Sequence, residues 1–305
     1  MLLKNKIPLS YIFSQVKYEL LLVMCYGLSI ELAYNIFNIH VTAVSIPITV
    51  SSVFGTILSL LLAFRSNQAY DRWWEARTIW GAIVNDSRSF GRQVLTMMEN
   101  PENEDIKAFQ DRMILRQIAW CYALAKSLRT TDPMPFTKEF LTPKEQEYIR
   151  KYSNKPVAIL DLHGKDLQYA LKMGWINQFQ QVNFDSSLSK FSDSMGKAER
   201  IKKTVFPTTY GLYIKWAVCV FVLLLPFGLV DLFGFLMVPV LMIVAIFFFL
   251  IEKTAVQLQD PFENKATDIP LMAISRTIEI DLKEMMQNED TEIPKPYATK
   301  HFYLL

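Results

Sequence analysis

The longest apolar run in this chain covers 36 residues, from Trp216 to Ile251, and contains one charged side chain, Asp231. A second run, from Leu32 to Phe64, contains no Asp, Glu, Lys or Arg. A helix that crosses a bilayer needs about 20 mostly apolar residues, because the hydrocarbon core is about 30 Å thick. The chain is therefore predicted to be an integral membrane protein.

The apolar runs divide best into four membrane-spanning helices that form two hairpins, at Leu20–Phe37, Val44–Phe64, Thr208–Val230 and Phe235–Ile251. The joints within the hairpins, Asn38–Ala43 and Asp231–Gly234, contain no Lys or Arg, whereas 22 such residues lie between Arg65 and Phe206. Positive residues collect on the cytoplasmic side of membrane proteins. We therefore expect a multi-pass protein of the inner (plasma) membrane, with both joints outside and both termini in the cytoplasm.

The segment between the hairpins is predicted to be a cytosolic helical domain, so the fold class is all-α. Trp73, Trp80 and Val84 recur at helical spacing with charges between them. Four segments result: residues 1–64 with the first hairpin, 65–206 as the cytosolic domain, 207–251 with the second hairpin, and 252–305 as a cytosolic tail. Loops are expected at Pro133, Pro135, Pro143 and Pro156, and a helix near Ser275–Gln287.

The sequence lacks the motifs of the common enzyme classes. No nucleotide-binding loop, HExxH, G-x-S-x-G or Rossmann fingerprint is present. The three histidines and three cysteines are far apart, so no metal or cofactor site is indicated. A net charge of +2 does not suggest a nucleic-acid partner. We expect neither an enzyme nor a cofactor.

Two stripes run along the second predicted span. Ile46, Val50 and Phe54, followed by Ile57, form an apolar stripe, and the polar stripe is Ser45, Thr49, Ser52, Thr56 and Ser59. The polar stripe suits either a water-filled pore or contacts between closely packed helices. The apolar stripe suits either lipid or a hydrophobic constriction that gates by losing its water. Periodicity alone leaves these alternatives open.

Two further residues of the first hairpin bear on the interpretation. Pro47 falls within the first turn or so of the second span, where its missing N–H costs little, so it is a plausible start signal for that helix. Glu31 lies inside the first span. An ionisable group at membrane depth is a functional candidate, although a position near the outer end would let it reach the interface instead.

The residues that follow the second span carry a family resemblance. Phe64 to Arg77 reads FRSNQAYDRWWEAR, and its run Asp71, Arg72, Trp73, Trp74 resembles the hallmark of bacterial bestrophins. Pro261 and Phe262, after the fourth span, resemble the family's polar-Pro-Phe motif. The order of two spans, a long insert and two more spans is also similar, so the resemblance covers nearly the whole chain.

The resemblance implies a homopentameric ion channel with a hydrophobic gate, embedded in membrane lipid. Five second spans would surround a central pore, lined by the neck residues Ile46, Val50 and Phe54, and the polar stripe would pack between helices. A second constriction near the cytosolic exit would involve Ile176 or Phe179, in a helix expected at Trp175–Phe184. Rival interpretations are a secondary transporter and a membrane-anchored scaffold.

Two departures from animal bestrophins have consequences. The acidic run that binds calcium in those channels is degenerate here, with Lys265 inside it and carboxylates only near Asp260, Glu263 and Asp268, so calcium regulation is not expected. The middle neck residue is Val50 in place of a phenylalanine, whose positive ring edge would favour anions. We expect monovalent cations such as sodium to be favoured, with chloride as the alternative.

Overall fold

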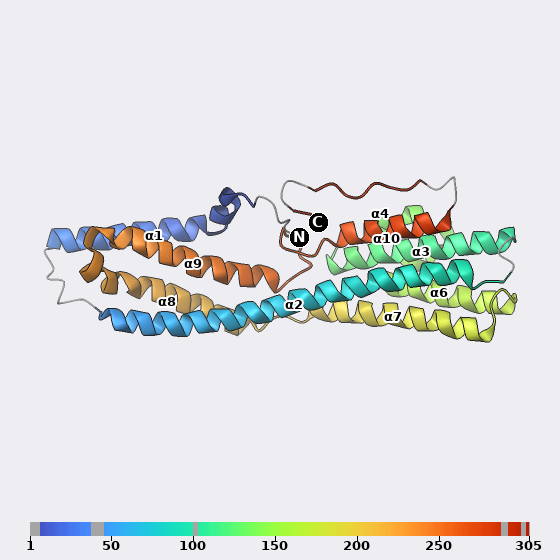
Figure 1. Ribbon diagram of the computed structural model, residues 1–305, viewed down its shortest axis with the longest axis horizontal. Helices are drawn as coiled ribbons and strands as arrows, with labels where there is room; N and C mark the ends of the chain where they lie inside the picture. The colour runs from blue at the N-terminus through green and yellow to red at the C-terminus, as the bar shows by residue number, and fades with distance from the viewer. Residues whose placement is uncertain (1–6, 38–45, 100–102, 288–291, 300–302, 305) are drawn as a thin grey trace. The chain divides into compact units, whose positions relative to one another are not determined.

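The computed structural model describes residues 7–37, 46–99, 103–287, 292–299 and 303–304 (Figure 1). The elements formed by the described residues are α-helices and short 3-10 helices. The chain separates into two compact units. We call residues 3–73 and 205–260 the apolar unit, and residues 74–204 and 261–305, grouped with 1–2, the polar unit.

The apolar unit holds α1 (Leu9–Phe37), the first part of α2 (Ile48–Thr96), α8 (Thr208–Phe233), the short 3-10 turn η3 (Gly234–Leu236) and α9 (Met237–Leu258). Within the described residues, four helices are long and apolar enough to cross a membrane. Their shared core consists of side chains from all four, including Val16, Leu62, Val218 and Leu241. The predicted four apolar segments are thus helices in the structure.

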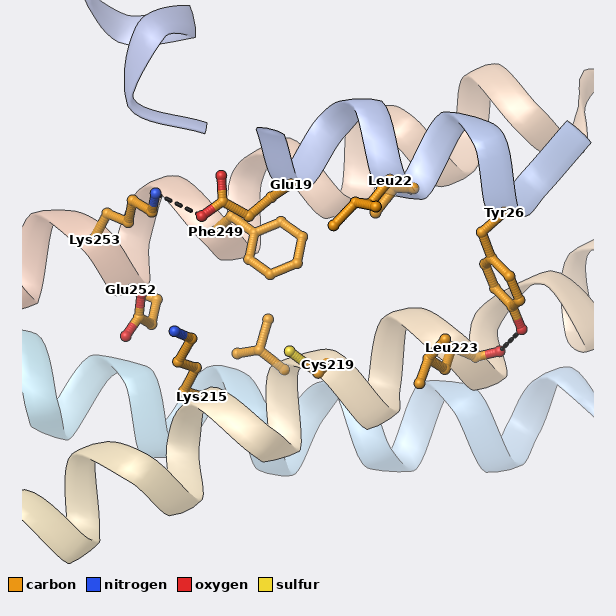
Figure 2. Close-up of a pocket in the computed structure, with 11 residues that line it drawn as sticks. Glu19, Leu22, Tyr26, Lys215, Cys219, Leu223, Phe249, Glu252 and Lys253 are labelled. Atoms are coloured by element: carbon orange, nitrogen blue, oxygen red, sulfur yellow. Dashed lines mark hydrogen bonds and ion pairs between the residues drawn. The ribbon is translucent and has the colours of Figure 1, made fainter. Parts of the chain in front are cut away.

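Two polar contacts also join the helices of the apolar unit (Figure 2). The Tyr26 hydroxyl of α1 donates to the Leu223 carbonyl of α8 at 2.7 Å. The Lys253 ammonium of α9 lies 2.6 Å from the Glu19 carboxylate of α1. Both contacts place a hydrogen-bonding or charged group against a partner, as a largely apolar surrounding requires.

The helices differ in their bounds from the predicted spans, most of all α1 and α2. Helix α1 begins at Leu9 rather than Leu20, because the polar residues of its first turns are tolerated at its surface, where the Lys17 ammonium lies over the Tyr18 ring. Helix α2 continues from the apolar run to Thr96, because no proline interrupts it. Val44 and the first joint, Asn38–Ala43, lie outside the described residues.

The polar unit contains the rest of α2 and seven further elements. They are α3 (Glu104–Leu128), α4 (Met134–Thr137), the 3-10 turn η2 (Lys138–Phe140), α5 (Pro143–Arg150), α6 (Lys155–Lys172), α7 (Gln178–Lys203) and α10 (Leu271–Met286). The Phe90 ring of α2 contacts the rings of His163, Phe184 and Phe191 edge-on, with centroids 5.2, 6.1 and 5.8 Å away. Aromatic side chains from α2, α6 and α7 therefore form one core.

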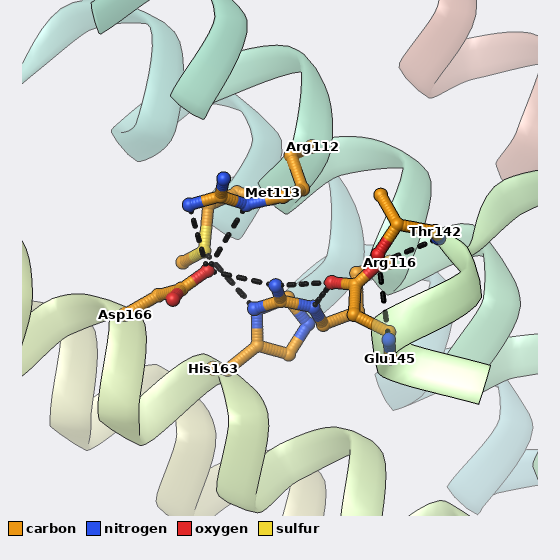
Figure 3. A network of polar contacts seen from close by, with 7 residues as sticks. All are labelled: Arg112, Met113, Arg116, Thr142, Glu145, His163 and Asp166. Carbon is orange, nitrogen blue, oxygen red and sulfur yellow. Dashed lines mark hydrogen bonds and ion pairs between the residues drawn. The ribbon is translucent and has the colours of Figure 1, made fainter. Parts of the chain in front are cut away.

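A buried ion network joins α3, α5 and α6 within the polar unit (Figure 3). The Arg116 guanidinium donates to Glu145 through Nε at 2.8 Å and through Nη2, and Nη2 also lies 2.7 Å from Asp166. Glu145 in turn accepts from Thr142 as part of a capping box at the start of α5. Burial acts to raise the pKa of Glu145, but the charge of Arg116 and these hydrogen bonds leave it lowered.

His163 lies beside this network and is fully buried. Its Nδ1 lies 3.4 Å from the Met113 sulfur. Burial, with the nearby charge of Arg116, lowers the pKa of His163 well below its ordinary value. The imidazole is therefore neutral at physiological pH and packs as part of the aromatic core.

Three of the four prolines expected in loops instead lie in the first turns of helices, whereas Pro133 lies in the loop before α4. Pro133 is the N-cap of α4, and Pro135 lies in its first turn. Pro143 is the first residue of α5, and Pro156 is the second residue of α6. Proline costs little there, because the N–H that it lacks has no intrahelical partner in the first turn. The predicted helix at Trp175–Phe184 also needs correction: α7 begins at Gln178.

Candidate functional site

The neck residues lie at the start of α2. Ile46 is half-buried and lies two residues before the start of α2 at Ile48, and its backbone N–H donates to the Phe227 carbonyl of α8 at 3.2 Å. A Cβ on Gly228 would come within 3.3 Å of the Ile46 carbonyl, so the absent side chain lets α8 approach this point closely. The beginning of α2 is thus held by α8 rather than by its own helical hydrogen bonds alone.

The next two neck side chains lie on the surface of the subunit. Val50 is 47% exposed and Phe54 is 44% exposed, and Ile57 is exposed as well. The face of α2 that packs into the apolar unit is a different one, with Ser51, Leu58, Leu62 and Arg65 buried. The subunit therefore presents the predicted neck stripe outward.

The polar stripe lies on the exposed surface too, but its hydroxyls have partners in their own helix. Ser52 donates to the Ile48 carbonyl at 2.9 Å, Thr56 to the Ser52 carbonyl at 2.9 Å, and Ser59 to the Gly55 carbonyl at 2.7 Å. Ser45 lies outside the described residues. The hydrogen-bonding needs of these hydroxyls are met without pore water, which favours packing over a wet lining.

Sequence reasoning missed a buried ion pair that joins α2 to α9. Nη1 of Arg65 lies 3.2 Å from Glu252 of α9, and both side chains are buried. The same nitrogen lies 3.5 Å from the Gly211 carbonyl of α8. The available signal was a single charge directly after each of two apolar runs, since Arg65 follows Phe64 and Glu252 follows Ile251.

The four hallmark residues continue along α2. Arg72 lies 3.8 Å from Asp260, within the apolar unit. The Trp73 ring stacks on Tyr70, with centroids 6.2 Å apart. Asp71 and Trp74 are exposed. The structure therefore gives Arg72 and Trp73 contacts inside the subunit, and leaves Asp71 and Trp74 at its surface.

Pro261 and Phe262 are buried in the polar unit, and the acidic positions after them have partners of their own. Glu263 pairs with Lys202 at 2.6 Å. Asp268 is buried, and its Oδ2 accepts from the Lys265 backbone N–H at 3.1 Å. Burial raises the pKa of Asp268, and the backbone N–H groups of Lys265 and Asn264, with nearby positive charge, partly oppose this rise. The described residues include no group of three or more His, Cys, Asp or Glu placed to hold a metal.

The two candidates for a cytosolic constriction differ in their surroundings. Ile176 is 2% exposed, so its side chain belongs to the core of the polar unit. Phe179, in the first turn of α7, is 84% exposed. Asn177 and Gln180 form the capping box that starts α7 between these positions. Of the two side chains, only that of Phe179 lies at the surface.

Glu31, the ionisable residue of the first span, is half-buried near the end of α1. Its carboxylate accepts from the Asn35 amide one turn later, at 3.3 Å. The contact is local, within one helix. It supplies no link from Glu31 to the neck stripe among the described residues.

The comparisons with known proteins agree across sequence and structure. The family described as "Bacterial/Fungal Bestrophin protein" matches residues 6–284. A voltage-dependent anion channel-forming protein of Ralstonia nicotianae, RSc3414, is 31% identical over 269 residues, which cover 88% of this chain and 86% of that protein. The protein of the same description from Escherichia coli K12, YneE, is 29% identical and covers 83% of this chain and 81% of its own length.

Solved structures extend the likeness to the fold. The crystal structure of a bacterial bestrophin homologue from Klebsiella pneumoniae superposes with a TM-score of 0.82 at 26% identity, covering 89% of this chain and 98% of that one. The family match spans nearly all of the sequence, including the α2 hallmark and the Pro-Phe motif. The chain belongs to the bacterial and fungal bestrophin family.

Proposed function

We propose that this protein is a passive, pentameric ion channel of the bestrophin type, in which five copies of α2 surround one pore. The observation that carries the proposal is the division of α2 into faces. Val50 and Phe54 are exposed from the subunit, whereas the hydroxyls of the neighbouring stripe are bonded within the helix. Five such surfaces around an axis place apolar rings at the centre.

The proposed neck controls conduction through its width. Rings of Ile46, Val50 and Phe54 offer no hydrogen bonds that replace an ion's hydration shell. A narrow apolar tube tends to empty of water, so it resists ions when narrow and conducts when slightly wider. The anchoring of Ile46 to the Phe227 carbonyl supports a neck whose first ring is held in position by α8.

For selectivity we favour monovalent cations such as sodium, because Val50 lacks the positive ring edge that a phenylalanine would offer to anions. Chloride is the second candidate, favoured by the relatives, which are described as anion channel-forming proteins. The two candidates predict reversal potentials of opposite sign.

The remaining features follow from the same arrangement. The protein lies in the inner membrane as a multi-pass protein with cytoplasmic termini, and its partners are its own copies, membrane lipid and the permeant ions, with no nucleic acid. It needs no cofactor and no calcium. Phe179 is the better candidate for a ring at the cytosolic exit, because its side chain is exposed and that of Ile176 is not.

The test is reconstitution of the purified protein in a planar bilayer with a sodium chloride gradient. A channel gives currents driven by that gradient alone, and the sign of the reversal potential separates cation from anion conduction. A requirement for a second, coupled gradient would identify a transporter. Liposomes that show no ion flux at all would leave a scaffold as the better interpretation, and a monomeric particle would contradict the pentameric pore.

A further inference from the structure

The apolar unit contains a cavity of about 430 Å³ between α1, α8 and α9 (Figure 2). Its volume lies within the range of about 300–1,000 Å³ that is usual for small-molecule sites. The middle of the cavity is lined by side chains without charge: Leu22, Val23, Val218, Cys219, Leu223 and Phe249. An occupant of this part must therefore be apolar.

The two ends of the cavity differ. At one end, the hydrogen bond from Tyr26 to the Leu223 carbonyl joins α1 to α8. At the other end lie the charged residues Glu19, Lys215, Glu252 and Lys253. An apolar middle and charge at one end match an amphiphile with a hydrocarbon chain and an ionised head.

The balance of charge at this end sets the sign of the head group. Lys253 pairs with Glu19 at 2.6 Å, and Glu252 pairs with Arg65 at 3.2 Å. Lys215 makes no ion pair with any residue that the structure describes, and its side chain is exposed. One positive charge is left over beside two neutralised pairs, so a head group with one negative charge is the complement.

A second hollow adjoins the charged end of the cavity. This hollow has a volume of about 570 Å³ and shares Lys215, Glu252 and Lys253 with the first cavity. Its further lining is mixed, with the polar side chains of Arg65, Thr208, Gln257, Gln259 and Asp260 beside apolar ones such as Val205, Phe206 and Leu212. Nε of Arg65 lies buried in its lining without an acceptor among the described residues. A carboxylate at Lys215 would thus lie at the charged end of the first cavity, where the second hollow adjoins it.

From this arrangement we propose that the cavity binds a long-chain fatty acid, with the hydrocarbon chain between α1, α8 and α9 and the carboxylate on Lys215. One apolar cavity and one surplus cation match one chain and one charge. An anionic phospholipid shares the head-group charge but brings a second chain, so it serves as the competing ligand in the test. None of the neck-stripe residues lines the cavity, and the proposal does not depend on conduction.

The experiment uses the full-length purified protein and a palmitate analogue with a diazirine near its methyl end. After irradiation, cross-linked peptides are mapped by mass spectrometry, and unlabelled palmitate and phosphatidylglycerol are tested as competitors. Cross-links in the peptides that carry Leu22, Tyr26, Cys219 and Leu223, displaced by palmitate and not by phosphatidylglycerol, are expected. Cross-links spread over the exposed lipid-facing side chains would overturn the proposal, and displacement by phosphatidylglycerol alone would replace the fatty acid with a phospholipid.

Two pairs of variants make the test specific. Lys215→Gln is expected to weaken labelling about tenfold and Lys215→Arg to retain it, because a hydrogen bond to a charged group is lost in the first and kept in the second. Lys17→Gln, at an exposed lysine of α1 that does not line the cavity, is the control. Cys219→Phe fills the cavity and should abolish labelling, whereas Cys25→Phe, at an exposed cysteine, should not.

Equal labelling in Lys215→Gln and Lys17→Gln would overturn the assignment of the head group. Equal labelling in Cys219→Phe and Cys25→Phe would overturn the assignment of the chain. Each variant is first checked for the same assembly size as the wild type by size-exclusion chromatography. Should Cys219→Phe not assemble, Cys219→Leu, which adds less volume, replaces it and is expected to reduce labelling in part.

Discussion

Arg65 of α2 and Glu252 of α9 form an ion pair at 3.2 Å with both side chains buried. The two residues are 187 positions apart in the sequence. The pair joins the helix that carries the neck stripe to the last apolar helix, directly after the apolar run of each.

Glu252→Ala is expected to destabilise the protein by about 3–5 kcal/mol, because it leaves the Arg65 charge buried without a partner. Thermal unfolding in detergent measures the change. Replacing both residues by apolar ones, as Arg65→Met with Glu252→Leu, should recover most of the loss. The control is Glu147→Ala, which removes an exposed ion pair with Lys151 and should have little effect. Equal melting points for Glu252→Ala and Glu147→Ala would contradict this role of the pair.

The double variant Val50→Ala with Phe54→Ala is expected to raise single-channel conductance, because smaller side chains widen the apolar neck and let it stay hydrated. The matched control is Ser52→Ala with Thr56→Ala on the adjacent stripe, whose hydroxyls are bonded within α2. Its conductance should be unchanged. Unchanged currents in the first variant would reject the neck, and changed currents only in the second would assign the pore to the polar stripe.

Arg116→Met is expected to destabilise the polar unit by about 3–5 kcal/mol, because Glu145 and Asp166 lose the buried cation between them. Arg112→Met provides the comparison, since Arg112 also pairs with Asp166 but is 40% exposed. Its cost should stay below about 1 kcal/mol. Chemical denaturation followed by tryptophan fluorescence measures both values. A smaller loss in Arg116→Met than in Arg112→Met would show that the network does not hold α3, α5 and α6 together.

Buried His163 should make stability depend on pH. Its pKa in the folded protein is lowered well below 6.5, so at mildly acidic pH the unfolded chain binds a proton that the folded chain does not. The stability that depends on neutral His163 is therefore fully present above about pH 6.5. Below that pH the free energy of unfolding falls, by up to about 1.4 kcal/mol per pH unit. The carboxylate of Glu145, whose pKa is lowered from 4.5, adds a loss only at still lower pH.

His163→Gln should flatten this dependence between pH 6.5 and 5, whatever its effect on absolute stability. Met113→Leu keeps the imidazole while removing the sulfur beside Nδ1, so it should retain the wild-type slope. Melting points recorded across this pH range give both slopes. A wild-type slope in His163→Gln would exclude His163 as the titrating group.

Isothermal titration with calcium is expected to give no binding in the micromolar range. Calcium needs six to eight oxygen ligands, commonly from several carboxylates. Glu263 is engaged by Lys202, and Asp268 by the Lys265 backbone N–H. Lys202→Ala frees Glu263 and provides a check, because it should not by itself create micromolar affinity. A clear micromolar signal in the wild type would overturn the prediction.

The sequence predicted the apolar helices well, because a long run without charge has few alternatives to a membrane helix. It also indicated the family through the Asp71–Trp74 run. It did not predict the Arg65–Glu252 pair, because periodicity describes one helix at a time and the partners belong to different ones. The start of α7 was readable, since Asn177 and Gln180 have capping-box spacing, but the apolar residues before it gave the stronger signal. The exposure of Phe179 and the burial of Ile176 depend on packing.

The hydroxyls of Ser52, Thr56 and Ser59 satisfy themselves within α2. A surface that packs against this stripe therefore needs no hydrogen-bond partner for these hydroxyls. It needs only a shape that fits closely against small side chains. The residues that face the stripe can thus be exchanged for other apolar residues of similar size, and no buried polar atom loses its hydrogen-bond partner. Side chains opposite this strip should tolerate substitution far more readily than the partners of Arg65, which must supply a charge.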